Sequence, residues 1–239
     1  MFESLILHIE TATDICSVAV SEGDQKLSLV ESGPERSHAT LLNSFIRKAL
    51  KDAGKEFSSL RGVAVSKGPG SYTGLRIGVS TAKGIAYALE IPLLASGTLE
   101  NLAYGALKHP SFRQPLHEYS DRLLLCPMLD ARRMEVYSCF FSVDLQVHRK
   151  VSADIVTAES YRDLLEDHQI YFFGNGAAKC SQVLNHPHAH FVEGINPSAV
   201  QMIQPVWLRF RNRQFEDVAY FEPFYLKDFI ATVPRKKVL

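Results

Sequence analysis

A glycine-rich block in the first half of the chain is the segment best suited to chemistry. It reads Lys67-Gly-Pro-Gly-Ser-Tyr-Thr-Gly-Leu-Arg-Ile-Gly78 and lies between a strand-like run and a helix-like one. Glycine lets a ligand approach the backbone, and the first amides of a helix lack partners, so this order suits an anion site. The block contains neither G-K-[ST] nor G-x-G-x-x-G. A tight turn into a close-packed helix explains the same glycines, and both interpretations stay open.

Histidine and cysteine give weaker signals. The run His186-Pro-His-Ala-His190 has alternate histidines, but its proline and the lack of nearby carboxylate or thiol ligands favour a solvated loop over a metal site. The four cysteines are Cys16, Cys126, Cys139 and Cys180. Because no two of them form a C-x-x-C pair, we expect buried thiols in a reducing compartment.

Charge and hydropathy restrict the partners. Lys plus Arg and Asp plus Glu are equal at 26 each, so no net field attracts nucleic acid or an anionic membrane. Basic clusters at residues 209–213 and 235–237 could touch RNA phosphate, although solvated charge explains them as well. The apolar runs are far shorter than the roughly 20 residues that cross a bilayer, and the start of the chain lacks a basic, cleavable leader. We expect a cytoplasmic protein that meets no membrane and meets RNA indirectly.

The elements that position the glycine block follow from hydrophobic periodicity. Strands are predicted at residues 5–9, 15–20, 26–31, 61–66 and 92–95. Helices are predicted at residues 40–53, 75–89 and 98–108. Ser37 is the expected cap of the first helix and Gly54 its stop, while Thr98 is the expected cap of the third.

The same order recurs in the second half. Residues 109–121 hold two prolines and no periodicity, so they are interpreted as a connection. Strands are then predicted at residues 123–130, 135–142, 146–152, 170–173 and 191–193. Helices are predicted at residues 161–166, 177–185 and 199–211. The repeated order strand, strand, strand, helix, strand, helix predicts an α/β fold of two lobes across a cleft, as in actin and sugar kinases. We expect lobes at residues 1–110 and 111–239, with the last helix returning to the first lobe.

Three segments resemble one family. They are Ile6-Leu-His-Ile-Glu-Thr-Ala-Thr-Asp-Ile-Cys-Ser-Val-Ala-Val20, the glycine block with Ala82-Lys-Gly84, and Asp130-Ala-Arg-Arg-Met-Glu-Val-Tyr137. Their order and sequence resemble the TsaB (YeaZ) family, the partner branch of the glycoprotease-like superfamily that includes TsaD. Glu10 departs from the pattern, since the family usually has aspartate there. Its longer side chain moves the carboxylate by about 1.5 Å, which puts metal-assisted phosphate chemistry in doubt.

The resemblance also separates a catalytic branch from a partner branch. In the catalytic branch it implies a metal held by His-x-x-x-His, whose i, i+4 spacing puts both imidazoles on one helix face. The corresponding positions here are Thr98 and Leu102, and no His-x-x-x-His occurs in the chain. We therefore expect no resident metal or cofactor and no catalysis by the isolated chain. Leu99, Leu102, Ala103 and Ala106 are expected to face the core.

The function implied by the resemblance is that of a binding subunit. It would support a TsaD-like subunit that forms threonylcarbamoyladenosine beside the tRNA anticodon, together with a TsaE-like ATPase. The alternatives are a metal-dependent glycoprotease-like hydrolase and an actin-like small-molecule kinase, which fold alone favours weakly. The sequence leaves open whether nucleotide binds and whether the isolated chain forms a homodimer.

Two sets of residues are candidate sites. The partner surface is predicted on helices 40–53 and 75–89, where a flat glycine stripe would accept a second helix. Its members are Leu42, Phe45, Ile46, Ala49, Gly74, Gly78, Thr81, Ala82 and Ile85. Packing against the chain's own sheet is the alternative, and Gly78→Arg, expected to stay folded but lose its partner, separates the two. The cleft candidates from the family motifs are Glu10, Gly68, Gly70, Ser71, Asp130 and Arg132.

Overall fold

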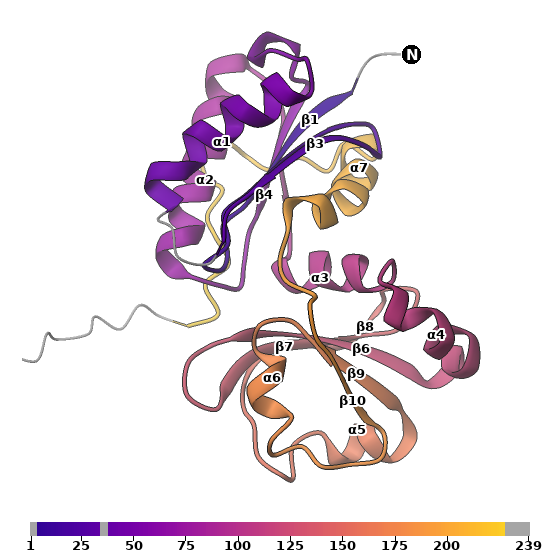
Figure 1. Ribbon diagram of the computed structural model, residues 1–239. Coiled ribbons are helices and arrows are strands. Elements are labelled where there is room, and N and C mark those ends of the chain that lie inside the picture. The colour runs from indigo at the N-terminus through magenta and orange to yellow at the C-terminus, as the bar shows by residue number, and fades with distance from the viewer. Residues whose placement is uncertain (1–3, 34–37, 228–239) are drawn as a thin grey trace, which may run out of the picture.

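The computed structural model describes residues 4–33 and 38–227. Its described residues form two lobes, and each lobe contains a five-stranded sheet (Figure 1). Ser37, the expected cap of the first helix, lies outside the described residues.

The first lobe contains three antiparallel strands followed by alternating helices and strands. Its strands are β1 (Leu5–Glu10), β2 (Ser17–Glu22), β3 (Gln25–Glu31), β4 (Gly62–Ser66) and β5 (Leu93–Ser96). Its helices are α1 (His38–Asp52) and α2 (Tyr72–Leu89), and α3 (Thr98–Ala106) follows them. Short 3-10 turns lie at η1 (Phe57–Ser59) and η2 (Pro110–Phe112).

The second lobe follows the same order. Its strands are β6 (Leu123–Asp130), β7 (Glu135–Phe141), β8 (Val147–Ile155), β9 (Gln169–Phe173) and β10 (Ala189–Val192). The remaining helices and 3-10 turns are α4 (Arg113–Tyr119), η3 (Ser120–Arg122), α5 (Arg162–Asp167), α6 (Ala177–Cys180), η4 (Ala199–Met202) and α7 (Ile203–Arg211).

Strand order shows that the two lobes share one topology. The first sheet has the order β3-β2-β1-β4-β5, and the second, counted from its other edge, has the order β8-β7-β6-β9-β10. In both sheets the first strand pairs antiparallel with the second and parallel with the fourth. The predicted duplicated, two-lobed α/β fold is therefore confirmed.

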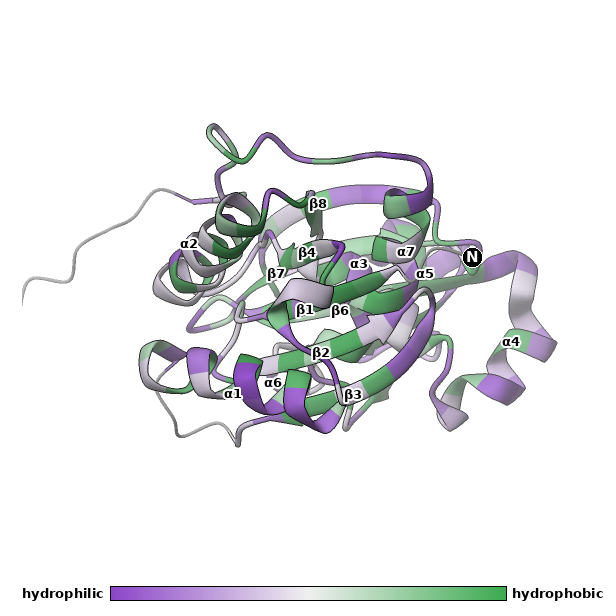
Figure 2. Ribbon diagram, turned by 90° about the horizontal axis from the view of Figure 1, so that it is seen from above, coloured by the Kyte–Doolittle hydropathy of each residue, from purple (hydrophilic) through white to green (hydrophobic). Residues whose placement is uncertain are grey.

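Four apolar clusters form the cores of the two lobes. The helices α1 and α2 cover one face of the first sheet, where Leu42, Ile46 and Ala82 pack against its strands (Figure 1). Residues of η4 and α7, including Met202 and Val206, pack against Ile6 and Leu94 on another face. Figure 2 shows apolar residues along the central strands and hydrophilic residues along much of α4.

Helix α3 lies between the lobes in Figure 1 and packs on the second sheet. Its residues Leu99, Leu102, Ala103 and Ala106 are all buried, which confirms the prediction of a core-facing side. The same cluster contains Leu125 and Phe173 of the second lobe. Because α3 follows β5 directly, it connects the first sheet to the core of the second.

Two segments differ from the prediction by more than a shift of up to three residues at the end of an element. Residues 109–121, expected to be an irregular connection, contain α4, whose partly buried Leu116 and Tyr119 pack on the core of the second lobe. These two apolar residues are three apart, which suits a single helical turn but is too short a pattern to detect in the sequence. Helix α6 ends at Cys180 rather than continuing to residue 185.

Candidate functional site

Glu10 ends β1 and is fully buried. Its Oε1 accepts a hydrogen bond from the Ala12 amide at 2.7 Å, while Oε2 has no hydrogen-bond partner among the described residues. Burial removes the carboxylate from water and raises the pKa of Glu10 to about 7, although the Ala12 amide and the nearby Ser66 hydroxyl oppose the shift. The carboxyl group can therefore gain or lose a proton near neutral pH.

The glycine block packs directly against the turn that follows Glu10. A Cβ on Gly70 would lie 2.3 Å from the Ala12 carbonyl oxygen, and one on Gly74 would lie 2.1 Å from the Thr11 carbonyl oxygen. The Ser71 amide donates to the Ala12 carbonyl at 2.6 Å. Glycine is required here because backbone meets backbone, so the block serves as a close-packed turn in this structure.

Helix α2 begins at that turn. Ser71 is its cap, and the Ser71 hydroxyl accepts a hydrogen bond from the Gly74 amide at 3.2 Å. The Thr11 hydroxyl donates to the Gly74 carbonyl at 2.8 Å. Gly68 has a φ of +109°, a conformation that side-chain-bearing residues rarely adopt. The turn, the glycine loop and the helix start thus form one interlocked unit.

Buried polar side chains surround this unit. The hydroxyls of Ser66 and Thr98 are 2.8 Å apart, and Ser66 and Asn101 both lie near the Glu10 carboxylate. The side-chain oxygen of Ser96 and both polar atoms of Asn101 are buried with no hydrogen-bond partner in the described part of the chain. Buried polar atoms without a hydrogen-bond partner thus gather beside the Glu10 carboxylate.

Thr98 is not the cap of α3. Gly97 occupies that position, and its amide donates to the Glu100 carboxylate at 3.2 Å. Thr98 is the first helical residue, and its hydroxyl points to Ser66 instead. The expected cap is wrong by one residue because Thr98 pairs with a strand residue that no local pattern indicates.

The second lobe has an equivalent turn at the end of β6. The Asp130 carboxylate accepts from the Arg132 amide at 2.9 Å and forms an ion pair with Lys179 at 2.5 Å. The Asn175 side chain accepts from the Asp130 amide at 3.1 Å. Here the carboxylate is about half exposed, with a side-chain exposure of 49%. Arg132 is exposed and has a φ of +72°.

The cleft candidates thus form two groups. Glu10, Gly68, Gly70 and Ser71 belong to the interlocked unit of the first lobe, and Asp130 and Arg132 belong to the turn of the second. Within residues 4–33 and 38–227, no hydrogen bond or ion pair joins the two turns. No group of three or more His, Cys, Asp or Glu residues in that part of the chain is arranged to hold a metal ion. No described helix is long and apolar enough to cross a membrane.

The predicted partner surface needs a correction. Six of its nine residues are buried within the chain: Leu42, Ile46, Ala49, Gly74, Gly78 and Ala82. A Cβ on Gly78 would lie 2.2 Å from the Thr11 hydroxyl oxygen, so the glycine stripe faces the chain's own turn. The interpretation of Gly74 and Gly78 as an outward, flat surface is wrong, because close packing against the strand end uses the same glycines.

The outward side of the two helices is different. A shallow groove of about 410 Å³ lies between α1 and α2. We call it the α1–α2 groove, and its lining residues are Asn43, Phe57, Ser80, Thr81, Gly84, Ile85, Ala88 and Leu89. Gly84 is exposed, and a Cβ there would meet no atom within 4 Å. Three predicted residues, Phe45, Thr81 and Ile85, are only partly buried.

The contacts of the segment that follows α7 were not predicted from the sequence. Its Phe224 amide donates to the Lys67 carbonyl at 2.7 Å, and the Phe224 carbonyl oxygen would lie 2.7 Å from a Cβ on Gly68. The Lys83 ammonium donates to the carbonyls of Ala219 and Phe221 at 3.1 and 3.0 Å. Side chains of the segment add to these contacts, since Phe221 packs on the core of the first lobe and the Tyr225 ring lies 4.8 Å from that of Tyr72.

The four cysteines are all buried and free, as predicted. Burial raises the pKa of Cys16 to about 11, that of Cys139 to about 12 and that of Cys180 to about 11, and it raises that of Cys126 as well. Thiols with raised pKa values are poor nucleophiles near neutral pH. The cysteines therefore contribute to packing.

The sequence is similar to proteins of one known family. Residues 32–233 match the family model described as TsaD: tRNA N6-adenosine threonylcarbamoyltransferase. The chain is 24% identical over 232 residues to the tRNA threonylcarbamoyladenosine biosynthesis protein TsaB of Haemophilus influenzae, covering 93% of each chain. It is 28% identical over 182 residues to the protein of the same description in Bacillus subtilis, covering 75% of this chain and 74% of that one.

Solved structures agree on the fold. YeaZ from Pseudomonas aeruginosa superimposes with a TM-score of 0.77 and 24% identity, covering 93% of this chain and all of that one. The topology and the motif positions define a two-lobed, actin-like protein of the superfamily that contains TsaD. The chain belongs to the TsaD family and, within it, to the TsaB (YeaZ) branch.

Proposed function

We propose that the chain is a non-catalytic subunit in the formation of threonylcarbamoyladenosine on tRNA. In this role it binds a TsaD-like catalytic subunit and holds that subunit in its active form. A TsaE-like ATPase joins the complex, and tRNA meets the chain only through the catalytic subunit. The isolated chain catalyses no reaction by itself.

The observation that carries the proposal is a family match over residues 32–233 combined with the residues of α3. Thr98 and Leu102 stand where the resemblance implies the metal-binding histidines of catalytic members, and Leu102 is fully buried in the core. A leucine side chain has no lone pair to offer a metal. Metal analysis of the purified chain should find no stoichiometric zinc or iron, and the chain alone should not modify tRNA. One tightly held metal ion per chain, lost on mutation near Thr98, would contradict this.

The α1–α2 groove is the surface we assign to the catalytic subunit. This side of α2 carries only small side chains at Ser80, Gly84 and Ala88. Phe57 and Ile85 beside them offer apolar surface for contact. A helix can approach closely over small side chains, because its ridges then fit the shallow groove. The same groove suits a second copy of the chain, so a homodimer would form when the catalytic subunit is absent.

Gly84→Arg tests this assignment. The exposed site has room for the new side chain, so the variant should keep a native circular dichroism spectrum and lose co-purification with the TsaD-like subunit of the same organism. Ala178→Arg, at an exposed position of α6 in the other lobe, is the matched control and should bind normally. Normal co-purification of a folded Gly84→Arg variant would place the interface elsewhere.

A further inference from the structure

A cavity of about 520 Å³ lies between the glycine loop, the start of α3 and the β7–β8 hairpin. Its lining residues include Lys67, Leu99, Glu100, Phe141, Lys150 and Val151. Both lobes and the segment after α7 contribute to it. Its size is within the range of small-molecule pockets, roughly 300–1,000 Å³.

Strand β8 is built irregularly at this cavity. Ser138 pairs with Ser152, and Phe140 pairs with Arg149, so two residues of β8 lie opposite the single residue Cys139 of β7. The two residues are Lys150 and Val151, and both line the cavity. A bulge of this kind re-aims side chains that would otherwise alternate between faces. The bulge accounts for two successive residues of β8 lining the same cavity.

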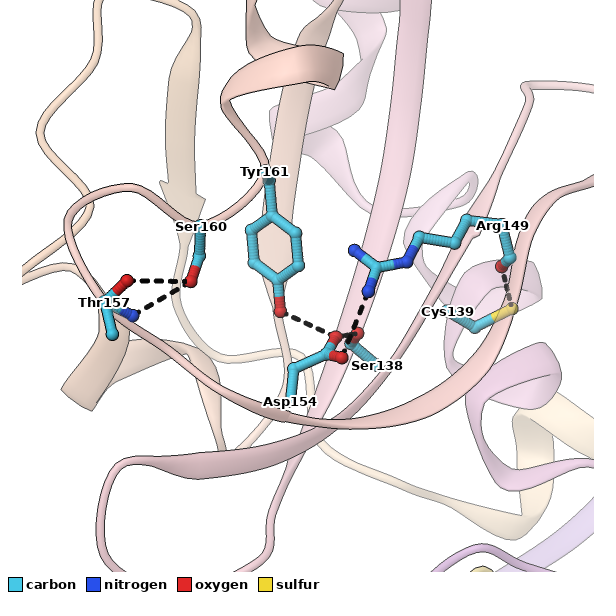
Figure 3. A network of polar contacts seen from close by, with 7 residues as sticks. All are labelled: Ser138, Cys139, Arg149, Asp154, Thr157, Ser160 and Tyr161. Carbon is cyan, nitrogen blue, oxygen red and sulfur yellow. Dashed lines mark hydrogen bonds and ion pairs between the residues drawn. The ribbon is translucent and has the colours of Figure 1, made fainter.

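Contacts on either side of the bulge fix its position. The Cys139 thiol donates to the Arg149 carbonyl at 3.1 Å, and the Arg149 guanidinium forms an ion pair with Asp154 at 3.1 Å. The Asp154 carboxylate also accepts from Ser138 at 2.5 Å and from Tyr161 at 2.9 Å. Figure 3 shows Ser138, Arg149 and Tyr161 converging on Asp154, while Cys139 lies apart beside the Arg149 carbonyl. The cavity wall is therefore held in place without any ligand.

The charges around the cavity are unbalanced. Arg209 is paired with Glu100, since its guanidinium donates to both carboxylate oxygens at 2.8 Å. Lys67 and Lys150 make no ion pair with any residue in the described part of the chain. Two lysines without an ion pair in that part of the chain, the partly buried Lys67 and the exposed Lys150, thus accompany a wall that is mostly apolar. Apolar lining with a few placed charges is typical of sites that orient a small ligand.

We propose that this cavity binds a small amphipathic anion, a carboxylate with an apolar body. Lys67 and Lys150 bind the carboxylate. Leu99, Phe141 and Val151 pack against the apolar body. The ligand contacts both lobes and the bulge of β8, so it would fix the position of one lobe against the other.

Calorimetric titration of the full chain with sodium octanoate tests the proposal. Octanoate should bind, whereas octylamine, which has an equal chain and the opposite charge, and inorganic phosphate, which has no chain, should bind at least tenfold more weakly. Equal binding of octylamine would show that charge plays no part. Equal binding of phosphate would show that the apolar wall plays none, and either result would overturn the proposal.

Variants place the ligand in this cavity. Lys67→Met combined with Lys150→Met should weaken octanoate binding at least tenfold, while Lys26→Met combined with Lys51→Met, at exposed positions elsewhere, should leave it unchanged. Val147→Asp adds a carboxylate at a lining residue that is 55% exposed, so the chain should stay folded and also lose octanoate. Unchanged affinity in the Lys67 and Lys150 double variant or in a folded Val147→Asp variant would refute the site.

Discussion

The two lobes share one strand order but differ where the first strand of each sheet ends. In the first lobe, Glu10 is fully buried beneath a glycine loop and the start of α2. In the second lobe, Asp130 is 49% exposed and is paired with Lys179 across the start of α6. The helix after the loop has 18 residues in the first lobe and 4 in the second.

Both lobes nevertheless use glycine at the same place. A Cβ on Gly70 would meet the Ala12 carbonyl oxygen at 2.3 Å, and a Cβ on Gly174 would meet the Met128 carbonyl oxygen at 2.3 Å. The loop after the fourth strand of each sheet therefore passes directly over the end of the first strand. The topology itself therefore requires these glycines, so a glycine-rich block here is weak evidence for phosphate binding.

The largest expected effect concerns the close packing of the first lobe. Gly78→Arg should destabilise the chain by about 4 kcal/mol or more, because even a Cβ would lie 2.2 Å from the Thr11 hydroxyl oxygen. Denaturant unfolding monitored by circular dichroism measures the loss. Gly84→Arg, on the exposed side of the same helix, should cost less than about 1 kcal/mol. A Gly78→Arg chain as stable as the wild type would break the distinction between the inward and outward sides of α2 in the first lobe.

The next effect is a pH dependence caused by the buried first-lobe carboxyl of Glu10. Buried His8, whose pKa is lowered to about 3 by burial, adds a dependence of the opposite sign that Glu10→Gln leaves in place. The pKa of Glu10 is raised to about 7 from 4.5, so the folded state favours its protonated form. The stability that this gives is present in full below pH 4.5 and is lost as the pH rises to 7, a change of roughly 3 kcal/mol. Glu10→Gln should remove this part of the pH dependence.

The control for that prediction lies in the second lobe. Asp130→Asn breaks a half-exposed ion pair with Lys179 and should change the free energy of unfolding by no more than about 1 kcal/mol. Unfolding midpoints measured from pH 4 to 8 compare the two variants. If Glu10→Gln keeps the pH profile of the wild type, the carboxyl group does not titrate as its burial implies.

How much of this was visible in the sequence depends on the range of the interactions. Hydrophobic periodicity predicted most strands, the main helices and the duplication, because those signals are local. It placed Gly78 on the wrong side of α2. Both faces of that helix carry small residues, and the pattern does not show that one face packs against Thr11 while the other is exposed. The contact of Phe224 with Lys67 is made by backbone groups far apart in the chain, and no residue pattern predicts it. The division between lobes after residue 110 stays a prediction.

A third effect tests the network that supports the second lobe. Asp154→Ala should cost about 2 kcal/mol, because it leaves the partly buried Arg149 without its ion pair and removes the acceptor of Tyr161. Thermal unfolding should show the loss. Glu159→Ala also breaks an arginine pair, but its carboxylate is 69% exposed, so it should cost less than about 0.5 kcal/mol. Equal losses in the two variants would mean that the network adds nothing beyond a surface ion pair.

The smallest expected effect is a gain in stability rather than a loss. Gly84 is an interior helical residue with an exposed surface, and a Cβ there meets no atom within 4 Å. Alanine is better than glycine in a helix by about 1 kcal/mol, because glycine loses more backbone freedom on folding. Gly84→Ala should therefore raise the melting temperature of the isolated chain by about 2–4 °C.

Gly78→Ala, the same substitution six residues earlier in the same helix, should lower the melting temperature because the new Cβ has no room beside Thr11. Calorimetric scans of both variants decide the matter: a stabilising Gly78→Ala would show that this glycine does not face the core, and a destabilising Gly84→Ala would show that its side of α2 is already in contact.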